Sequence, residues 1–293
     1  MKKQIIINLA LVLGIAVLVL YLNKPPTETV KQHSISAVKS ATISSIFIYR
    51  EQRETIHLVK KDIGWHIIQP IKAKANDVRI SLLLDLLSTR PKSHFKLTHE
   101  TDLHPFGLGS ASLSVRLNDE EFQFGNIETL NKLRYVKHNE VVYLIKDTLA
   151  PLLNASAASF IDNRLVPSPS KISRLELPLL DLNTDKNNLD KLSMTLSDGH
   201  WSSNMPSLSS DTLVEIASSW QQAYAMQVIQ VSEQSLQNLT GQKVLINYTN
   251  TPPSEFILQL SATNLSLINS AARLKYQFPI AMKHKLFVHT ESN

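Results

Sequence analysis

Residues 56–70 read IHLVKKDIGWHIIQP, and residues 192–206 read LSMTLSDGHWSSNMP. Each stretch opens with apolar residues at every second position, passes through a polar turn and ends in Trp-x-x-x-x-Pro. Alternation predicts a half-buried strand, the turn predicts a hairpin, and the proline ends the second strand. The same hairpin is therefore predicted twice, at one constant offset that matches Ile56 with Leu192 and Pro70 with Pro206.

Outward from the hairpins, the neighbouring segments also match. An opening strand is predicted before each hairpin from the apolar residues Ile43, Ile46 and Ile48, and then Ile172, Leu175 and Leu177. A helix is predicted after each hairpin, over 77–89 and 211–224, because apolar residues recur at helical spacing. Those residues are Ile80, Leu83, Leu84 and Leu87 in the first helix, and Leu213, Ile216, Ala217 and Trp220 in the second. Thr212 and Glu215 have the spacing of a capping box at the start of the second helix.

Further short strands are predicted after the first helix, over 113–117, 122–124, 133–136 and 141–145. The tripeptide Leu133-Arg134-Tyr135 is echoed by Leu274-Lys275-Tyr276, at a slightly larger offset than that of the hairpins. Strand hairpins with one helix predict an α+β domain, in which the helix covers one face of a mostly antiparallel sheet. We therefore expect two tandem related domains, at 42–165 and 166–293.

The N-terminus predicts a membrane anchor. Residues Ile5 to Leu22 form an uncharged run of 18 residues, about 27 Å long as a helix, which is enough to cross the hydrocarbon core. Lys2 and Lys3 precede the run and favour a cytoplasmic N-terminus. A cleaved secretion signal is the alternative, but no small-residue cleavage pattern follows. The sequence predicts an uncleaved anchor at 1–23, a linker at 24–41, and globular domains in the periplasm of a bacterium, tethered to its inner membrane.

Composition excludes several classes of function. The chain has no cysteine, so it cannot form disulfides, thiolate metal sites or a cysteine nucleophile. A net charge of +5 over 293 residues is too small for a nucleic-acid footprint. The ten histidines show no metal-binding spacing, and the seven glycines form no phosphate-binding loop. The sequence predicts no metal, no cofactor and no catalytic residues.

The two hairpin tryptophans are candidate binding residues. Trp65 and Trp201 occupy the same place in the two repeats, each five residues before a proline, Pro70 or Pro206. Packing inside a core is one interpretation, and stacking against a ligand is the other. Packing in both repeats predicts that the two tryptophans lie in equivalent buried positions.

A longer series of motifs resembles a known family. The anchor, the opening strand and Gly64-Trp65 are followed by the motifs Phe106-Gly107-Leu108, Phe124-Gly125, Tyr135-Val136, Val142-Tyr143-Leu144-Ile145 and Phe160-Ile161-Asp162-Asn163-Arg164. In this order they resemble the bacterial family known as domain of unknown function 4340, over about residues 43–225. The resemblance implies an envelope role, since similar domains occur with gliding-type ABC transporter systems. It implies no catalytic residues.

Within this resemblance, Asp162 and Arg164 match the family's Asp-x-Arg element. They are predicted either to form a buried ion pair that clamps the junction between the two repeats, or to provide an anion site through Arg164. Both uses remain open from the sequence.

The function expected from these features is non-catalytic. Catalysis needs an asymmetric cluster of polar groups in one pocket, whereas the recognisable features of this chain are repeated and mostly apolar. We therefore expect a membrane-anchored, single-pass envelope protein that binds or positions a partner, such as another envelope or membrane protein. One alternative is an accessory subunit of an ABC-type transport system. The other is a hydrolase of envelope polymers.

Overall fold

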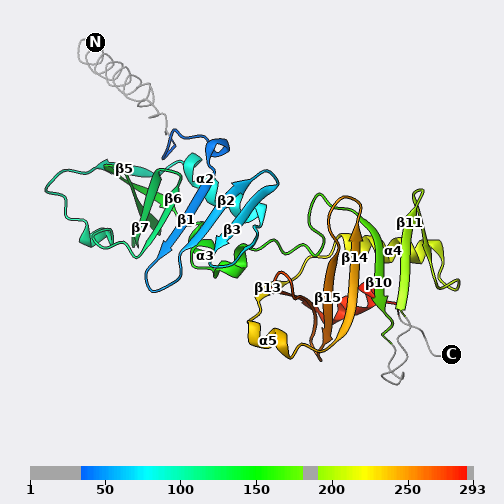
Figure 1. Cartoon of the computed structure of the whole chain (residues 1–293). Helices are drawn as coiled ribbons and strands as arrows, with labels where there is room; N and C mark the ends of the chain where they lie inside the picture. The colour runs from blue at the N-terminus through cyan, green and yellow to red at the C-terminus, as the bar shows by residue number, and fades with distance from the viewer. Residues whose placement is uncertain (1–33, 181–190, 289–293) are drawn as a thin grey trace, which may run out of the picture.

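The computed structural model describes residues 34–180 and 191–288, which form two antiparallel sheets and a few helices (Figure 1). The predicted anchor at 1–23 and most of the predicted linker lie outside these residues. None of the helices in the described ranges has the length and apolar character needed to cross a membrane.

The first sheet has nine strands in the order β4-β3-β2-β1-β6-β7-β8-β9-β5. Its strands are β1 (Ser45–Arg50), β2 (Ile56–Lys61), β3 (Gly64–Gln69), β4 (Ala73–Lys74), β5 (Ser93–Lys96), β6 (Leu113–Leu117), β7 (Glu120–Ile127), β8 (Leu133–His138) and β9 (Val141–Lys146). The helical segments of this part of the chain are η1 (Ser40–Thr42), α2 (Asp77–Ser88), η2 (His104–Phe106), α3 (Ala150–Leu153) and η3 (Ala157–Phe160). The strands predicted from alternation are all present.

The second sheet has eight strands in the order β12-β11-β10-β14-β15-β16-β17-β13. Its strands are β10 (Ile172–Pro178), β11 (Lys191–Ser197), β12 (His200–Ser203), β13 (Gln227–Gln230), β14 (Gln242–Tyr248), β15 (Ser254–Leu260), β16 (Asn264–Asn269) and β17 (Leu274–Pro279). The accompanying helical segments are α4 (Ser210–Gln221), α5 (Glu233–Gln237), η4 (Ile280–Met282) and α6 (Lys283–Leu286).

The two sheets repeat one strand order. If β4 is set aside, β3-β2-β1-β6-β7-β8-β9-β5 corresponds strand by strand to β12-β11-β10-β14-β15-β16-β17-β13. In both, a long helix (α2 or α4) follows the hairpin and precedes a strand at the far edge of the sheet (β5 or β13). The fold is mostly β with few helices, in two antiparallel sheets. One matched pair is wrong, because Leu133-Arg134-Tyr135 lies in β8 whereas Leu274-Lys275-Tyr276 lies in β17, the counterpart of β9.

The opening strand pairs with the first hairpin strand in the same register in both sheets. Leu58 of β2 pairs with Ile46 of β1, and Met194, which matches Leu58 in the second repeat, pairs with Leu175 of β10. All four side chains are fully buried, so the same face of each hairpin packs into a core. The hydrophobic alternation in the sequence therefore specified which face of these strands packs inward.

The helices correspond at a slightly smaller offset than the hairpins. The side chain of Asn76 caps α2 by accepting a hydrogen bond from the backbone N–H of Arg79, and Ser209 caps α4 in the same way from Thr212. The capping box predicted at Thr212 and Glu215 is therefore wrong, because Ser209 and not Thr212 is the N-cap. An Asn or Ser at this position satisfies one of the free N–H groups of the first turn.

The segment before β1 packs against the first sheet and α2, and we call residues 34–38 the docked tail. Ile35 and Ser36 are buried, and their backbone N–H groups donate to the carbonyls of Thr89 and Leu87, at the end of α2. The Ser36 hydroxyl donates to Glu120, whose carboxylate also lies 2.9 Å from Nε2 of the buried His138. The linker predicted over 24–41 therefore differs from the structure, in which its last part belongs to the folded region.

Candidate functional site at the junction of the two sheets

The two sheets are joined by an extended strap, which we define as residues 160–165. On one side the strap pairs with the chain just beyond β4, through an antiparallel bridge between Ala75 and Ile161. On the other side it pairs with the segment after α4, through a bridge between Arg164 and Tyr224. Backbone hydrogen bonds support the second pairing, from Leu165 to Ala223 and from Ala225 to Asn163. The strap thus contacts both halves of the chain by main-chain pairing.

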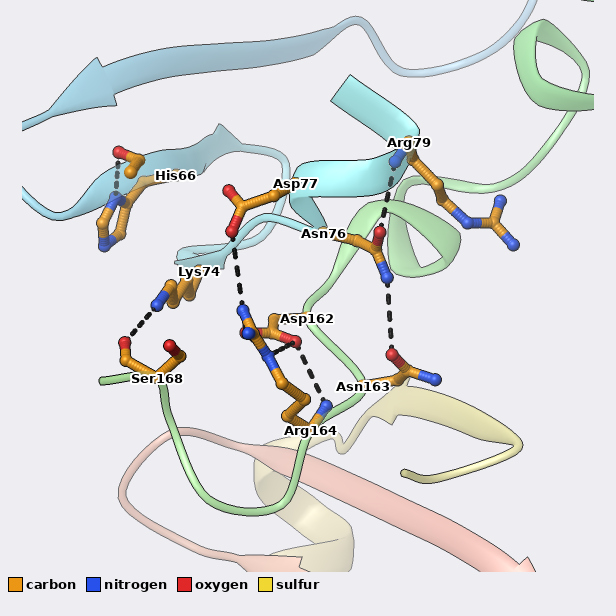
Figure 2. A network of polar contacts seen from close by, with 10 residues as sticks. His66, Lys74, Asn76, Asp77, Arg79, Asp162, Asn163, Arg164 and Ser168 are labelled. Carbon is orange, nitrogen blue, oxygen red and sulfur yellow. Dashed lines mark hydrogen bonds and ion pairs between the residues drawn. The ribbon is translucent and has the colours of Figure 1, made fainter. Parts of the chain in front are cut away.

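Arg164 is the ionic centre of this junction (Figure 2). Its Nε donates to both oxygens of Asp162, at 2.9 and 3.0 Å, and its terminal nitrogen lies 2.8 Å from Asp162 Oδ2. The same terminal nitrogen lies 3.5 Å from Asp77 Oδ2, at the start of α2. The hydrogen bond to Asp162 raises the pKa of the Arg164 guanidinium, although partial burial acts in the opposite direction. Arg164 therefore stays charged and holds the strap to α2.

Asp162 is buried while Arg164 is a quarter exposed, so the pair is only partly shielded from water. Asp162 also lies close enough to the second sheet for its charge to affect Tyr276 in β17. Burial raises the pKa of the Tyr276 phenol, and the negative charge of Asp162 raises it further. Of the two predicted uses of Asp162 and Arg164, the geometry is that of a clamp, because two carboxylates already balance the charge of Arg164.

Polar side chains on either side of the strap add further links (Figure 2). The Asn163 amide donates to the carbonyl of Ala225 at 2.9 Å and accepts from Asn76, the N-cap of α2, at 3.4 Å. The ammonium group of Lys74 donates to the carbonyl of Ser168 at 2.6 Å. Asn163 thus bridges α2 and the segment after α4, and Lys74 ties β4 to the loop before β10. The junction is fixed at several points.

A cavity of about 470 Å³ opens beside the strap, on the side of the second sheet. We call it the junction cavity. Its buried apolar lining comes from the loop before β10, from β10 and from α4, namely Val166, Ile172 and Ala217. Its more exposed lining includes Trp201, Leu196, Tyr224, Arg164 and Lys171. A volume of this size, apolar at the bottom and polar at the rim, suits a side chain or a small ligand.

The two hairpin tryptophans differ in exposure. Trp65 is buried, 7% exposed, and stands opposite Lys60 in the β2–β3 ladder. Trp201 is half-buried and stands opposite Leu196, which is 37% exposed. The two tryptophans are equivalent in strand register, as expected, but the expected burial is wrong for Trp201. Residues directly opposite in an antiparallel pair share one face of the sheet, so Trp201 and Leu196 together present an apolar surface to the junction cavity.

The structure thus brings two of the three candidate binding residues, Trp201 and Arg164, to one cavity and leaves Trp65 in the core. The hairpin prolines also differ, since the peptide bond before Pro70 is cis and the one before Pro206 is not. Sequence reasoning missed Leu196 and Tyr224, of which the second is 60% exposed. The signal for Leu196 was its place in the repeat, where it matches Lys60 and puts an apolar side chain in place of a surface lysine.

Within residues 34–180 and 191–288, no group of three His, Asp or Glu side chains is placed to hold a metal ion. The polar groups around the junction cavity are amides, hydroxyls and two basic side chains, beside the aromatic rings of Trp201 and Tyr224. This combination can stack, donate hydrogen bonds and attract a carboxylate.

The comparisons with known proteins show one match. No curated protein and no solved structure matches the chain. The family model described as Domain of unknown function (DUF4340) matches residues 65–259, which begin in the first hairpin and end in β15 of the second sheet. The match includes the strap, Asp162, Arg164 and Trp201, and it covers well over half of the chain. The chain therefore belongs to the DUF4340 family.

Proposed function

We propose that this protein is a non-catalytic, membrane-tethered envelope module, built from two tandem copies of one domain, which holds a polypeptide segment of a partner membrane protein in the junction cavity. The observation that carries the proposal is that Trp201 and Arg164 line one cavity. Trp201 offers a partly exposed aromatic face beside Leu196, and Arg164 offers the N–H groups that its two carboxylates leave unused.

The cavity has the composition of a protein-binding hot spot. Tryptophan, tyrosine and arginine contribute most of the energy in protein interfaces, and they act best around a desolvated apolar centre. Trp201, Tyr224 and Arg164 line the junction cavity together with its buried apolar residues, and a bound partner would exclude water from them. An aromatic or aliphatic side chain of the partner would pack on the apolar lining, a neighbouring carbonyl group would accept from Arg164, and an acidic group would meet Lys171.

The same arginine links binding to the arrangement of the domains. Arg164 pairs with Asp162 inside the strap and with Asp77 at the start of α2, and it also lines the cavity. A partner in the cavity therefore contacts the residue that joins the two domains. This supports a positioning role, in which the two domains act as a spacer of defined geometry.

The docked tail shortens the reach of the predicted tether. Residues 24–34 are the part of the chain between the predicted anchor and the buried Ile35. These eleven residues span about 36 Å at full extension. A module held so close to the bilayer meets other membrane proteins at a raised effective concentration, which favours even weak contacts.

The proposal is tested by crosslinking in the cell. A photoreactive amino acid replaces Tyr224 in the full-length chain, and in a matched control it replaces Ile63, which is similarly exposed (60% and 63%) but lies in the first hairpin turn. We expect a defined membrane-protein adduct from position 224, no adduct from position 63, and loss of the adduct when Trp201→Ala is added.

The identity of the adduct then separates the alternatives. A transporter subunit would make the protein an accessory of an ABC-type system. Equal adducts from both positions, or an adduct that survives Trp201→Ala, would contradict a binding role of the junction cavity. Cleavage of envelope polymers by the purified full-length chain would replace the proposal with the hydrolase alternative.

A further inference from the structure

A second cavity, of about 630 Å³, lies at the end of the first sheet where β1 ends and β8 begins. We call it the arginine pocket. Three arginines line it, Arg50, Arg53 and Arg134, and the carboxylate among its lining residues is that of Glu51. It shares no lining residue with the junction cavity. The three guanidinium groups in this cavity repel one another, and a bound anion would reduce that repulsion.

Neutral backbone carbonyls hold two of these arginines in place. Arg50 donates to the carbonyls of Ala155 and Glu54, and Arg53 donates to the carbonyl of Asn154 at 2.9 Å. Carbonyl groups orient a guanidinium without neutralising it. The side chains are therefore positioned in advance while their charge remains available, which is the arrangement that an anion site requires.

The charges of Arg50 and Arg53 are not balanced by ion pairs. Arg134 forms an ion pair with Asp147 at 2.7 Å, but in the part of the chain that the structure describes neither Arg50 nor Arg53 forms one. Partial burial lowers the pKa of Arg50, and the positive charge of Arg53 lowers it further. Bringing these two cations together costs free energy, which a bound anion would offset.

Unused donors also indicate an anion. The Nε groups of Arg50 and Arg134 are buried and have no hydrogen-bond partner among residues 34–180 and 191–288. A buried donor without an acceptor costs about 1–3 kcal/mol, so such groups are rare in folded proteins. Both belong to guanidinium groups that line the arginine pocket.

From this geometry we propose that the arginine pocket binds a phosphoryl group. A phosphate ester carries a charge of about −1.5 to −2 at neutral pH and has three strongly accepting oxygens. Three accepting oxygens suit the three guanidinium groups that line the pocket, whereas a carboxylate offers only two oxygens. The group can come from a soluble phosphate monoester or from phosphatidic acid, a lipid whose headgroup is a phosphate monoester. Since β1 starts beside the docked tail and ends at Arg50, the pocket lies at the end of the sheet away from that tail.

The test is to titrate the full-length chain in detergent with inorganic phosphate at constant ionic strength and to measure the heat of binding by calorimetry. Arg53→Ala is the informative variant, because Arg53 is exposed and its loss disturbs the fold least. Arg90→Ala is the matched control, since it removes the same charge from an exposed position just after α2, outside the pocket. We expect Arg53→Ala to weaken phosphate binding about tenfold or more, and Arg90→Ala to leave it unchanged.

A second arm identifies the source of the phosphoryl group. In the same detergent, each variant is titrated with a short-chain phosphatidic acid, and the affinity is compared with that for inorganic phosphate. Phosphate binding that depends on Arg53, without tighter binding of the lipid, indicates a soluble ligand. Tighter binding of the lipid that depends on Arg53 indicates a headgroup. If both kinds of binding are absent, or are equal in Arg53→Ala and Arg90→Ala, the inference is overturned.

Discussion

At the residue scale, the difference between Trp65 and Trp201 separates packing from binding. One sequence motif gives a buried side chain in the first hairpin and a half-buried one in the second. The residue paired with each tryptophan in the neighbouring strand differs in polarity. Lys60, opposite Trp65, is an exposed charged residue, whereas Leu196, opposite Trp201, adds an apolar side chain to the surface around Trp201. Sequence reasoning found the matched pair, but it could not predict exposure, because exposure depends on the strap and the loop before β10 that surround the cavity.

Alanine substitution should therefore have different effects at the two positions. Trp65→Ala removes a buried side chain and should lower the free energy of unfolding by about 3–5 kcal/mol. Trp201→Ala should cost less, about 1–2 kcal/mol, because part of the indole is already in water. Denaturant unfolding of the detergent-solubilised full-length chain measures both. Equal losses would show that Trp201 is a packing residue like Trp65.

The arginine pocket could not be predicted from the sequence either. Arg50 and Arg53 are close in the chain, but Arg134 is distant from them and joins them only because β1, β6, β7 and β8 are neighbours in the sheet. No local spacing in the sequence signals this cluster. Long-range sheet pairing was the missing information.

At the scale of elements, alternation and helical spacing predicted the hairpins and α2 almost to the residue. They missed the edge strands β5 and β13, which follow the helices and have few buried side chains. No strand was predicted at β14, β15 or β16 of the second sheet either. The strap was also missed as an element. It has no periodicity of its own, because its pairing partners are isolated bridges to Ala75 and Tyr224 and not a long ladder. The Asp-x-Arg motif inside it was the only signal of its role.

The ionic part of the strap should contribute measurably to stability. Asp162→Asn keeps the shape of the side chain but removes the charge that faces Arg164, so we expect a loss of about 2 kcal/mol, or about 4–8 °C in Tm. Asp77→Asn is the control. The Asp77 carboxylate is 53% exposed and lies 3.5 Å from the terminal nitrogen of Arg164, so its loss should change Tm by less than about 2 °C. Calorimetric melting of the full-length chain distinguishes the two. A larger effect of Asp77→Asn would mean that Asp162 is not the principal partner of Arg164.

At the scale of the whole molecule, two sheets with one strand order are joined by a strap that pairs with both halves of the chain. In our proposal a duplication accounts for the repeated sequence pattern, since the same hairpin and helix signals build each half. Within the described residues the halves differ near their junction: β4 belongs to the first sheet and has no counterpart in the second, and the junction cavity lies on the side of the second sheet. In our proposal this asymmetry gives a tethered spacer one binding site at its centre.

The central claim is that the junction fixes the two domains relative to each other, and a distance measurement tests it most directly. The natural chain has no cysteine, so Ile127→Cys in β7 and Leu260→Cys in β15 give two unique, exposed sites for spin labels. Double electron–electron resonance on the full-length chain should give one narrow distance distribution. The distribution should broaden when Arg164→Ala removes the clamp. A broad or multiple distribution in the unmodified junction would show that the domains move independently, which would contradict a spacer of defined geometry.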